Sequence, residues 1–191
     1  DSYTIGQSVA VDQRWPVQLV AALHTDGTAI ADPEIIATTG WTTDELSAGI
    51  DAANPQGTYE LVSLLIGVNN QYRGRDTGEY RTHFRDLLNR SIVYANHIAA
   101  HVLVVSIPDW GATPFANGKD RAAIAIAIDD FNAINREETI SVGATYVDIT
   151  PISRRALTEA NLVAGDGLHP SGLMYAEWVK LLEPVAKKIL Q

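Results

Sequence analysis

A carboxylate and an imidazole stand three positions apart near the C-terminal end of the chain. The stretch is "AGDGLHPSG", in which Asp166 and His169 lie on a predicted loop that Pro170 closes at the start of the next helix. An aspartate this close can hydrogen-bond to the histidine and fix its tautomer, which leaves the other ring nitrogen free to act as a base. This pair is the first candidate for catalytic chemistry.

Three further stretches offer a nucleophile and hydrogen-bond donors. Ser2 lies in "DSYTIG" at the beginning of the chain, Gly40 in "ATTGWTTDEL" and Asn69 in "LLIGVNNQYRG". A serine hydroxyl can attack an acyl carbon, while free backbone N–H groups and an asparagine amide can stabilise the oxyanion that forms. Each stretch also fits an ordinary polar turn, so the prediction depends on a fold that brings all of them together.

The other four histidines have no such carboxylate beside them, and we interpret them as structural. His83 and His97 fall in a predicted helix, His101 begins a predicted strand and His24 ends a predicted helix. His169 is therefore the one histidine with a predicted catalytic role.

Four apolar runs with β-branched residues predict the strands that must position these residues. They cover residues 34–39, 59–68, 101–108 and 144–150. The second and third runs are almost continuously apolar, which is typical of strands buried on both faces of a parallel sheet.

Segments with helical spacing lie between the predicted strands. Apolar side chains line one face in two of them: Tyr80, Phe84, Leu87, Leu88, Ala95 and Ile98 in the first, and Tyr175, Trp178, Val179, Leu182, Ala186 and Ile189 in the second. Another helix is predicted over residues 14–25, with Pro16 in its first turn.

Two pairs of residues mark the N-termini of further helices. Thr42 and Glu45 form a capping box, and Asp76 with Glu79 forms a weaker one.

Alternating helices and strands predict a flavodoxin-like three-layer α/β/α sandwich in one domain over residues 1–191, with a parallel sheet of order 2-1-3-4-5. Because the chain opens with a helix, we expect the first strand to precede Asp1. That strand would lie between the strands ending at Gly40 and Asn69. The turns that carry Ser2, Gly40 and Asn69 are then neighbours at the carboxyl edge of the sheet, to which the loop of His169 also returns.

The four stretches resemble the signature blocks of the SGNH hydrolases, also called the GDSL family of esterases and lipases. "DSYTIG", "TGWTT", "GVNN" and "DGLHP" are similar to the GDS(L), glycine, GxND and DxxH blocks and occur in the family order along nearly the whole chain. There are two departures: the glycine before Asp1 is absent, and Asn70 stands where the family usually has aspartate. We expect the loop geometry to survive the second.

The resemblance implies a role for each residue. Ser2 would be the nucleophile, His169 the base and Asp166 the residue that orients it. The N–H groups of Ser2 and Gly40 and the side-chain amide of Asn69 would form the oxyanion hole. Ester hydrolysis would then pass through an acyl-enzyme without a cofactor or a metal ion.

Aromatic residues beyond the predicted strand ends offer walls for a substrate pocket. They are Trp41, Tyr72, Trp110 and Phe115; covering the edge of the core is an equally good interpretation. Arg73 and Arg75 follow the Asn69 loop and could meet an anionic group, although solvated arginines are the commoner case. No long apolar lid segment is present, which favours short acyl esters, above all acetyl groups on carbohydrates.

Composition limits the partners of this chain. The formal net charge of −9 disfavours nucleic acid, and no apolar run reaches the length of about 20 residues that spans a bilayer. A small-molecule or glycan ester therefore remains the expected partner. The chain has no cysteine, which excludes a cysteine nucleophile and a thiolate metal site. A periplasmic or secreted location is slightly favoured over the cytoplasm, while the oligomeric state is left open.

Two other functions remain open from the sequence. One is a lysophospholipase or thioesterase that acts on longer acyl chains. The other is a non-catalytic flavodoxin-like module that binds a ligand in the same crevice, although the chain contains neither GxGxxG nor GxxxxGK[ST] for a phosphate. A third possible function is that of a catalytically inactive family member that binds glycans.

Overall fold

A parallel sheet forms the centre of the molecule. The computed structural model describes all of residues 1–191, and the sheet contains β1 (Val62–Leu64), β2 (Val102–Val105) and β3 (Thr145–Val147) in the order β1-β2-β3. The middle strand is completely buried, which is why its sequence is apolar at every position.

The register aligns the carboxyl ends of the three strands. Val62 lies opposite Val102, and Leu103 lies opposite Thr145. Loops that leave these strands therefore emerge on one edge of the sheet, which is where ligands bind in open α/β folds.

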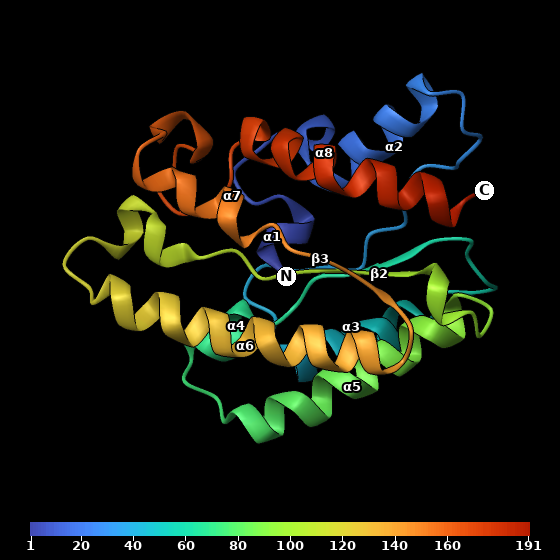
Figure 1. Cartoon of the computed structure of the whole chain (residues 1–191), viewed down its shortest axis with the longest axis horizontal. Helices are drawn as coiled ribbons and strands as arrows, with labels where there is room; N and C mark the ends of the chain where they lie inside the picture. Colours follow the sequence, from blue (N-terminus) through green and yellow to red (C-terminus); the bar gives the residue numbers. More distant parts are fainter.

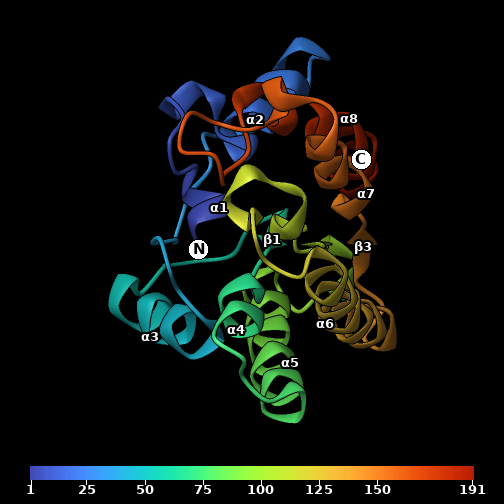
Figure 2. The ribbon, with the colours of Figure 1, turned by 90° about the vertical axis from the view of Figure 1, so that its left-hand side faces the viewer.

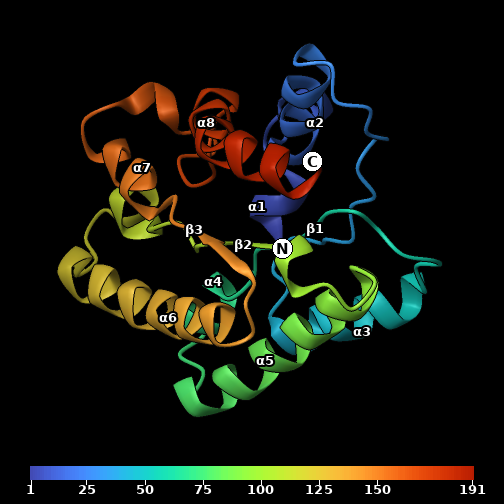
Figure 3. The same ribbon diagram turned by 45° about the vertical axis from the view of Figure 1, so that its right-hand side comes forward.

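Helices cover both faces of the sheet, so the predicted three-layer α/β/α arrangement is confirmed (Figures 1 and 3). On one face lie α2 (Trp15–Thr25), α7 (Thr150–Arg154) and α8 (Gly172–Ile189). On the other lie α3 (Thr43–Ala53), α4 (Val68–Tyr72), α5 (Thr77–Tyr94) and α6 (Arg121–Ser141). The short helix α1 (Ser2–Ile5) lies beside the N-terminus at the level of the sheet, between the two helical layers (Figure 2).

Large aromatic side chains fill the space between these layers. Trp15, Tyr80, Phe84, Tyr175 and Trp178 are almost completely buried. Burial of each such side chain stabilises the fold by about 1.5–3 kcal/mol or more relative to exposure. None of the helices combines the length and apolar character that crossing a bilayer would require.

The predicted helix starts are confirmed at atomic detail. Thr42 and Glu45 form a reciprocal capping box at the start of α3, which satisfies N–H groups that the first turn leaves free. The carboxylate of Asp76 accepts hydrogen bonds from the N–H groups of Gly78 and Glu79 at the start of α5. Pro16 occupies the first turn of α2, as predicted.

The predicted strand at residues 34–39 does not form, so the sheet contains three of the four strands predicted within residues 1–191. Residues 31–37 are irregular, and their backbone makes no hydrogen bond with other backbone groups. An isolated extended segment cannot become a strand without a neighbour on which to form a ladder. The apolar run 59–68 likewise contributes only Val62–Leu64 to the sheet.

The C-terminal end of α5 was predicted too far along the chain. The helix ends at Tyr94, so Ala95 caps it and Ile98 lies outside it with 41% of its surface exposed. His97 has a φ of 62° and follows the helix rather than belonging to it. His101 ends a short 3₁₀ turn, one residue before β2.

Candidate active site

The site begins at the capped first turn of α1. The Asp1 carboxylate accepts a hydrogen bond from the Tyr3 N–H at 3.1 Å and so caps the helix that starts at Ser2. Ser2 is only 5% exposed, and its N–H donates to no other backbone group. Donors of a first helical turn have no partner within the helix. The Ser2 N–H is therefore free to meet an anionic oxygen.

The predicted Asp166–His169 pair is present. Nδ1 of His169 lies 2.6 Å from Oδ2 of Asp166. The backbone N–H groups of Leu168 and His169 donate to the other carboxylate oxygen at 2.9 and 3.0 Å. His169 is 8% exposed, so its ring is held on one side by the carboxylate and shielded over most of its surface.

Ser8, which no sequence motif singled out, is a fourth donor to this carboxylate. The hydroxyl of Ser8 donates to Oδ2 of Asp166 at 2.6 Å. Ser8 has a φ of 67°, in the left-handed region, and it lies in the loop that follows α1. Because 158 positions separate the two residues, no local pattern could have indicated this contact.

These donors set the ionisation of Asp166. Burial by itself would raise the pKa of the carboxyl group. The hydrogen bonds from Ser8, from the His169 ring and from the two backbone N–H groups outweigh that effect and hold the pKa well below its usual value. Asp166 is consequently a carboxylate at neutral pH, and it can accept a hydrogen bond from a protonated Nδ1 of His169.

Contacts of Tyr3 bring the start of α1 to the His169 ring. The ring centroids of Tyr3 and His169 are 5.5 Å apart, and the Tyr175 hydroxyl donates to the Tyr3 carbonyl at 2.9 Å. The hydroxyl of Ser2 and the ring of His169 make no hydrogen bond with each other. Such contacts are often long in free enzymes and tighten when substrate binds.

Gly40 and Asn69 meet at the neighbouring turn. The side-chain amide of Asn69 donates one hydrogen bond to the Trp41 carbonyl at 2.9 Å, and its second N–H has no partner among the protein groups. Gly40 has a φ of 88°, a conformation that glycine adopts readily, and its N–H makes no backbone hydrogen bond. Two of the three predicted oxyanion donors thus lie on contacting turns.

The guanidinium group of Arg73 binds protein groups of this turn and of α3 rather than an anionic ligand. Its Nη2 donates to the Gly40 carbonyl at 2.6 Å, and its Nη1 lies 3.2 Å from the Glu45 carboxylate. Arg75 lies near Asp44 and Glu79, at 3.9 and 3.5 Å. The interpretation of both arginines as simply solvated was therefore incomplete, because each one is paired with carboxylates of neighbouring helices.

Asn70 fixes the start of α3 on the Asn69 loop. Its side-chain carbonyl accepts from the Thr43 N–H at 3.1 Å, and its amide donates to the Thr43 hydroxyl at 2.8 Å. Asn70 is 2% exposed. Both the oxygen and the nitrogen of the side-chain amide make hydrogen bonds. These bonds account for the intact loop at the position where the SGNH hydrolases usually have aspartate.

A cavity of about 410 Å³ separates the α1 loop from the Gly40 turn. It is lined mainly by residues 5–9 and 37–39, together with Arg14. The hydroxyl of Thr39 donates to the Gln7 side chain at 2.7 Å beside it. The loops that carry Ser8 and Gly40 thus line the same cavity, and the hydrogen bond between Thr39 and Gln7 joins them at its side.

Three of the four predicted pocket aromatics gather in one cluster. The rings of Tyr72, Trp110 and Phe115 lie 5.2–6.3 Å apart, and the Trp110 N–H donates to Gln71. The Phe115 N–H donates to the Gly167 carbonyl at 2.9 Å, which ties the cluster to the loop between Asp166 and His169. Tyr72 and Phe115 are 51% and 42% exposed.

Trp41 does not join this cluster. Its ring lies against Gly49 in α3, so closely that a Cβ atom at Gly49 would come within 2.1 Å of the ring. Glycine at that helical position gives the tryptophan its room, and Trp41 therefore covers the edge of the core.

Comparison with protein families gives one match over most of the chain. Residues 1–177 match the GDSL-like lipase/acylhydrolase family. A search of curated proteins found no match.

Several solved structures share the fold at low sequence identity. A structure of TesA superimposes with a TM-score of 0.74 at 16% identity, covering 99% of this chain and 96% of the other. The psychrotrophic esterase EstA from Pseudoalteromonas sp. gives 0.70 at 16%, covering 100% and 94%. Axe2, an acetylxylan esterase from Geobacillus stearothermophilus, gives 0.63 at 18%, covering 92% and 80%.

Proposed function

The chain belongs to the GDSL-like lipase/acylhydrolase family and is a carboxylic ester hydrolase, and from this we propose that it cleaves short acyl esters through an acyl-enzyme on Ser2. The observation that carries the proposal is the Asp166–His169 pair at 2.6 Å, beside the α1 turn that bears Ser2. A base oriented by a carboxylate next to a serine is the arrangement that serine acyl transfer requires.

In the first step, Oγ of Ser2 attacks the ester carbon while Nε2 of His169 takes the hydroxyl proton. The bond between the acyl carbon and the leaving oxygen then breaks, and His169 returns the proton to the departing alcohol. Asp166 holds Nδ1–H throughout and stabilises the transient imidazolium.

In the second step, water replaces the serine. His169 takes a proton from the water as it attacks the acyl carbon, and the serine oxygen leaves with that proton. The N–H groups of Ser2 and Gly40 and the free N–H of Asn69 meet the negative oxygen in both steps. Fixed donors of this kind are the largest single contribution in many acyl-transfer enzymes.

For the substrate we propose acetyl esters on carbohydrates. The exposed rings of Tyr72 and Phe115 offer a flat apolar surface beside the loop of His169, and such surfaces commonly line ligand sites. The description of Axe2 as an acetylxylan esterase supports the same class. Longer acyl chains, as in lysophospholipid or thioester hydrolysis, remain the alternative that an acyl-length series decides.

Hydrolysis of p-nitrophenyl acetate, butyrate and octanoate by the protein and its Ser2→Ala variant tests this proposal. We expect acetate to be the best substrate and activity to vanish in Ser2→Ala. Ser141→Ala, at an exposed site on α6, serves as the matched control and should keep full activity. A preference for octanoate would instead favour the long-chain alternative.

Covalent labelling separates a serine enzyme from a binding module. A reactive organophosphonate should phosphonylate Ser2 and release its leaving group, so that the peptide containing Ser2 gains the mass of the phosphonyl group, and the Ser2→Ala variant should not be labelled. Folded protein that neither hydrolyses the esters nor takes the label would rule out the acyl-enzyme and leave a non-catalytic ligand-binding role. Release of acetate from acetylated xylo-oligosaccharides then tests the carbohydrate.

A further inference from the structure

The cavity of about 410 Å³ between the α1 loop and the Gly40 turn contains an arginine that no protein group neutralises. Arg14 lines this cavity, which we call the Arg14 pocket. Nε of Arg14 is buried without a hydrogen-bond partner, and no carboxylate forms an ion pair with its guanidinium group. Arg81 and Arg154, by contrast, bind carboxylates at 2.6 and 2.9 Å. Since a buried donor without an acceptor is destabilising, the Arg14 guanidinium group is available for an acceptor that a ligand supplies.

The end of α1 holds the Arg14 side chain in place. Gly6 ends this helix with a φ of 69°. A Cβ atom at Gly6 would lie 2.4 Å from Cγ of Arg14, so the arginine stem packs directly against the glycine. Because the stem is already held, the guanidinium group loses little conformational freedom when it binds an acceptor.

The other polar side chains of the Arg14 pocket are uncharged. They belong to Gln7, Ser8, Thr38 and Thr39, and no carboxylate lines the pocket. The Thr39 hydroxyl donates to the side-chain oxygen of Gln7 at 2.7 Å, which leaves the amide nitrogen of Gln7 for another partner. Hydroxyl and amide groups around one arginine suit a ligand that carries several hydroxyls and one carboxylate. The volume of the pocket is that of a small-molecule site.

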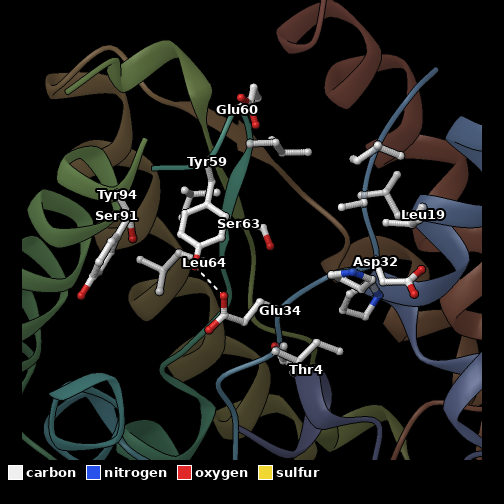
Figure 4. A pocket seen from close by; sticks show the side chains of 18 of the residues that line it. Thr4, Leu19, Asp32, Glu34, Tyr59, Glu60, Ser63, Leu64, Ser91 and Tyr94 are labelled. Atoms are coloured by element: carbon white, nitrogen blue, oxygen red, sulfur yellow. Dashed lines mark hydrogen bonds between the residues drawn. The ribbon is translucent and has the colours of Figure 1, made fainter. Parts of the chain in front are cut away.

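A larger cavity of about 830 Å³ has the opposite electrostatic character. It lies between residues 29–36 and Leu61–Leu65, and its lining includes the carboxylates of Asp32, Glu34 and Glu60 (Figure 4). Carboxylates outnumber cationic side chains there, and like charges repel an anionic ligand. An acidic ligand therefore favours the smaller Arg14 pocket.

Two walls of the Arg14 pocket continue into the candidate active site. Ser8 donates to Asp166 at 2.6 Å, and Thr39 directly precedes Gly40, a predicted oxyanion donor. Asp166 itself does not line the pocket, and four donors already bind its carboxylate. An acetyl group fills little space, so the pocket is placed for the alcohol part of an ester that is bound at Ser2.

We propose that the Arg14 pocket binds the carboxylate of an acidic sugar in the alcohol part of the ester, and that Arg14 selects this substrate. The inference rests on the proposed hydrolysis of acetylated carbohydrates. The guanidinium group pairs with the carboxylate, while the side chains of Gln7 and Thr38 meet the sugar hydroxyls. Such contacts are made in the ground state and in the transition state alike, so they lower KM for the acidic substrate and leave kcat unchanged.

Binding of glucuronate and glucose, which differ in the carboxylate, tests the pocket without the reaction. In a titration followed by amide NMR signals, glucuronate should shift the signals of residues 6–9 and 37–39, and glucose should bind about tenfold more weakly or worse. High salt should weaken the binding of glucuronate. Equal affinity for the two sugars would overturn the proposal, and acetate binding as tightly as glucuronate would overturn the assignment of a sugar.

A matched pair of variants tests the role of Arg14 in this binding. Arg14→Gln should weaken the binding of glucuronate by about tenfold or more, and Arg14→Lys, which keeps the charge, should lose less. Arg136→Gln removes the same charge from an exposed site on α6 and should bind glucuronate as the unsubstituted protein does. Equal affinities of Arg14→Gln and Arg136→Gln would overturn the proposal.

Kinetics on a matched pair of substrates connect the pocket to the reaction. The pair is a methyl glucoside and a methyl glucuronide that carry one acetyl group at the same position. KM should be about tenfold lower for the glucuronide at similar kcat, and this preference should disappear in Arg14→Gln. Equal KM values for the two substrates in the unsubstituted protein would overturn the proposal.

Failure of the pocket and failure of the proposed function give different results. Glucuronate binding through Arg14 in a folded protein that releases no acetate would support the pocket and rule out the acyl-enzyme. Acetate release from both substrates at equal KM, without glucuronate binding, would overturn the pocket and leave the proposed hydrolysis intact.

Discussion

At the scale of single residues, two hydrogen-bonding groups carry more than one task. Asn69 donates one side-chain N–H to the Trp41 carbonyl, and its other side-chain N–H is the proposed oxyanion donor. Asp166 accepts four hydrogen bonds, of which the one from Ser8 comes from the loop that follows α1. The hydrogen bonds of these two side chains join loops that are not connected by backbone hydrogen bonds.

Removing the Asn69 amide should slow the chemical step rather than weaken binding. We expect Asn69→Ala to lower kcat by about 10²–10³, equivalent to roughly 3–4 kcal/mol, with little change in KM. Steady-state kinetics on p-nitrophenyl acetate measure both constants. A melting curve controls for the lost contact to Trp41, and an unchanged kcat in a folded variant would remove Asn69 from the oxyanion hole.

Losing the Ser8 hydroxyl should impair the orientation of His169. Ser8→Gly relieves the positive φ and removes the donor to Asp166, so we expect kcat to fall by about tenfold, the scale of one hydrogen bond to a charged group. Ser8→Asn tolerates the same backbone conformation and keeps a donor, and it should retain most of the activity. If Gly and Asn variants lose activity equally, the hydroxyl–carboxylate bond is not the cause.

Asp166 should make stability depend on pH in the acid range. Its pKa is lower in the folded protein than the value of about 3.9 in an unfolded chain. The carboxylate therefore stabilises the fold above about pH 4, and this contribution is lost as the pH falls further. Urea unfolding from pH 7 to 3 should show a stability gap between the protein and Asp166→Asn that narrows with acidification; a constant gap would contradict this linkage.

At the scale of elements, burial and pairing are distinct properties of the sequence. The run 59–68 is apolar nearly throughout, yet only Val62–Leu64 pairs with β2. Gly67 then turns the chain with a φ of 130°, and a Cβ atom there would meet the Tyr80 hydroxyl at 2.3 Å. An apolar run thus predicts which segment is buried between the helical layers. Where the strand begins and ends depends instead on which of its residues have a neighbouring strand to pair with.

The contact between the Asn69 loop and α3 provides a test at this scale. Asn70→Ala should destabilise the protein by about 1–3 kcal/mol, because the buried Thr43 N–H loses its acceptor. Asn70→Asp can accept from both the N–H and the hydroxyl of Thr43, so it should cost much less. Urea midpoints of the three proteins measure the difference, and similar losses for Ala and Asp would contradict the assignment.

At the scale of the whole molecule, ion pairs join helices of one layer. The buried Glu138 of α6 pairs with Arg81 and Arg85 of α5 at 2.6 and 2.7 Å. The two arginine side chains are 37% and 55% exposed, whereas that of Glu138 is 5% exposed. Water can therefore replace the glutamate around the arginines but cannot readily replace the arginines around the glutamate.

This asymmetry predicts unequal costs for the two halves of the cluster. Glu138→Gln should cost about 1 kcal/mol, because the partly exposed arginine side chains can be hydrated when the carboxylate charge is removed. Arg81→Ala with Arg85→Ala should cost about 3 kcal/mol or more, because a buried carboxylate is left without a cation. Urea unfolding at pH 7 compares them. Equal losses would show that packing of the side chains, and not charge, dominates this contact.

Sequence alone determined most of the local structure and the identity of the candidate site. Thr42 and Asp76 marked helix starts because capping depends on residues only two or three positions apart. The Asp166–His169 contact was predictable for the same reason. The three strands of the sheet followed from their apolar runs, although their ends did not.

Strand pairing and side-chain contacts between residues far apart in the sequence were decided only by the tertiary structure. Residues 34–39 have strand-like composition and no ladder, because pairing needs a neighbour that composition cannot supply. Trp41 packs on Gly49 apart from the other aromatics, and Ser8 reaches Asp166 across 158 positions. Such contacts arise when separate loops meet at one edge of the sheet, which no local spacing in the sequence records.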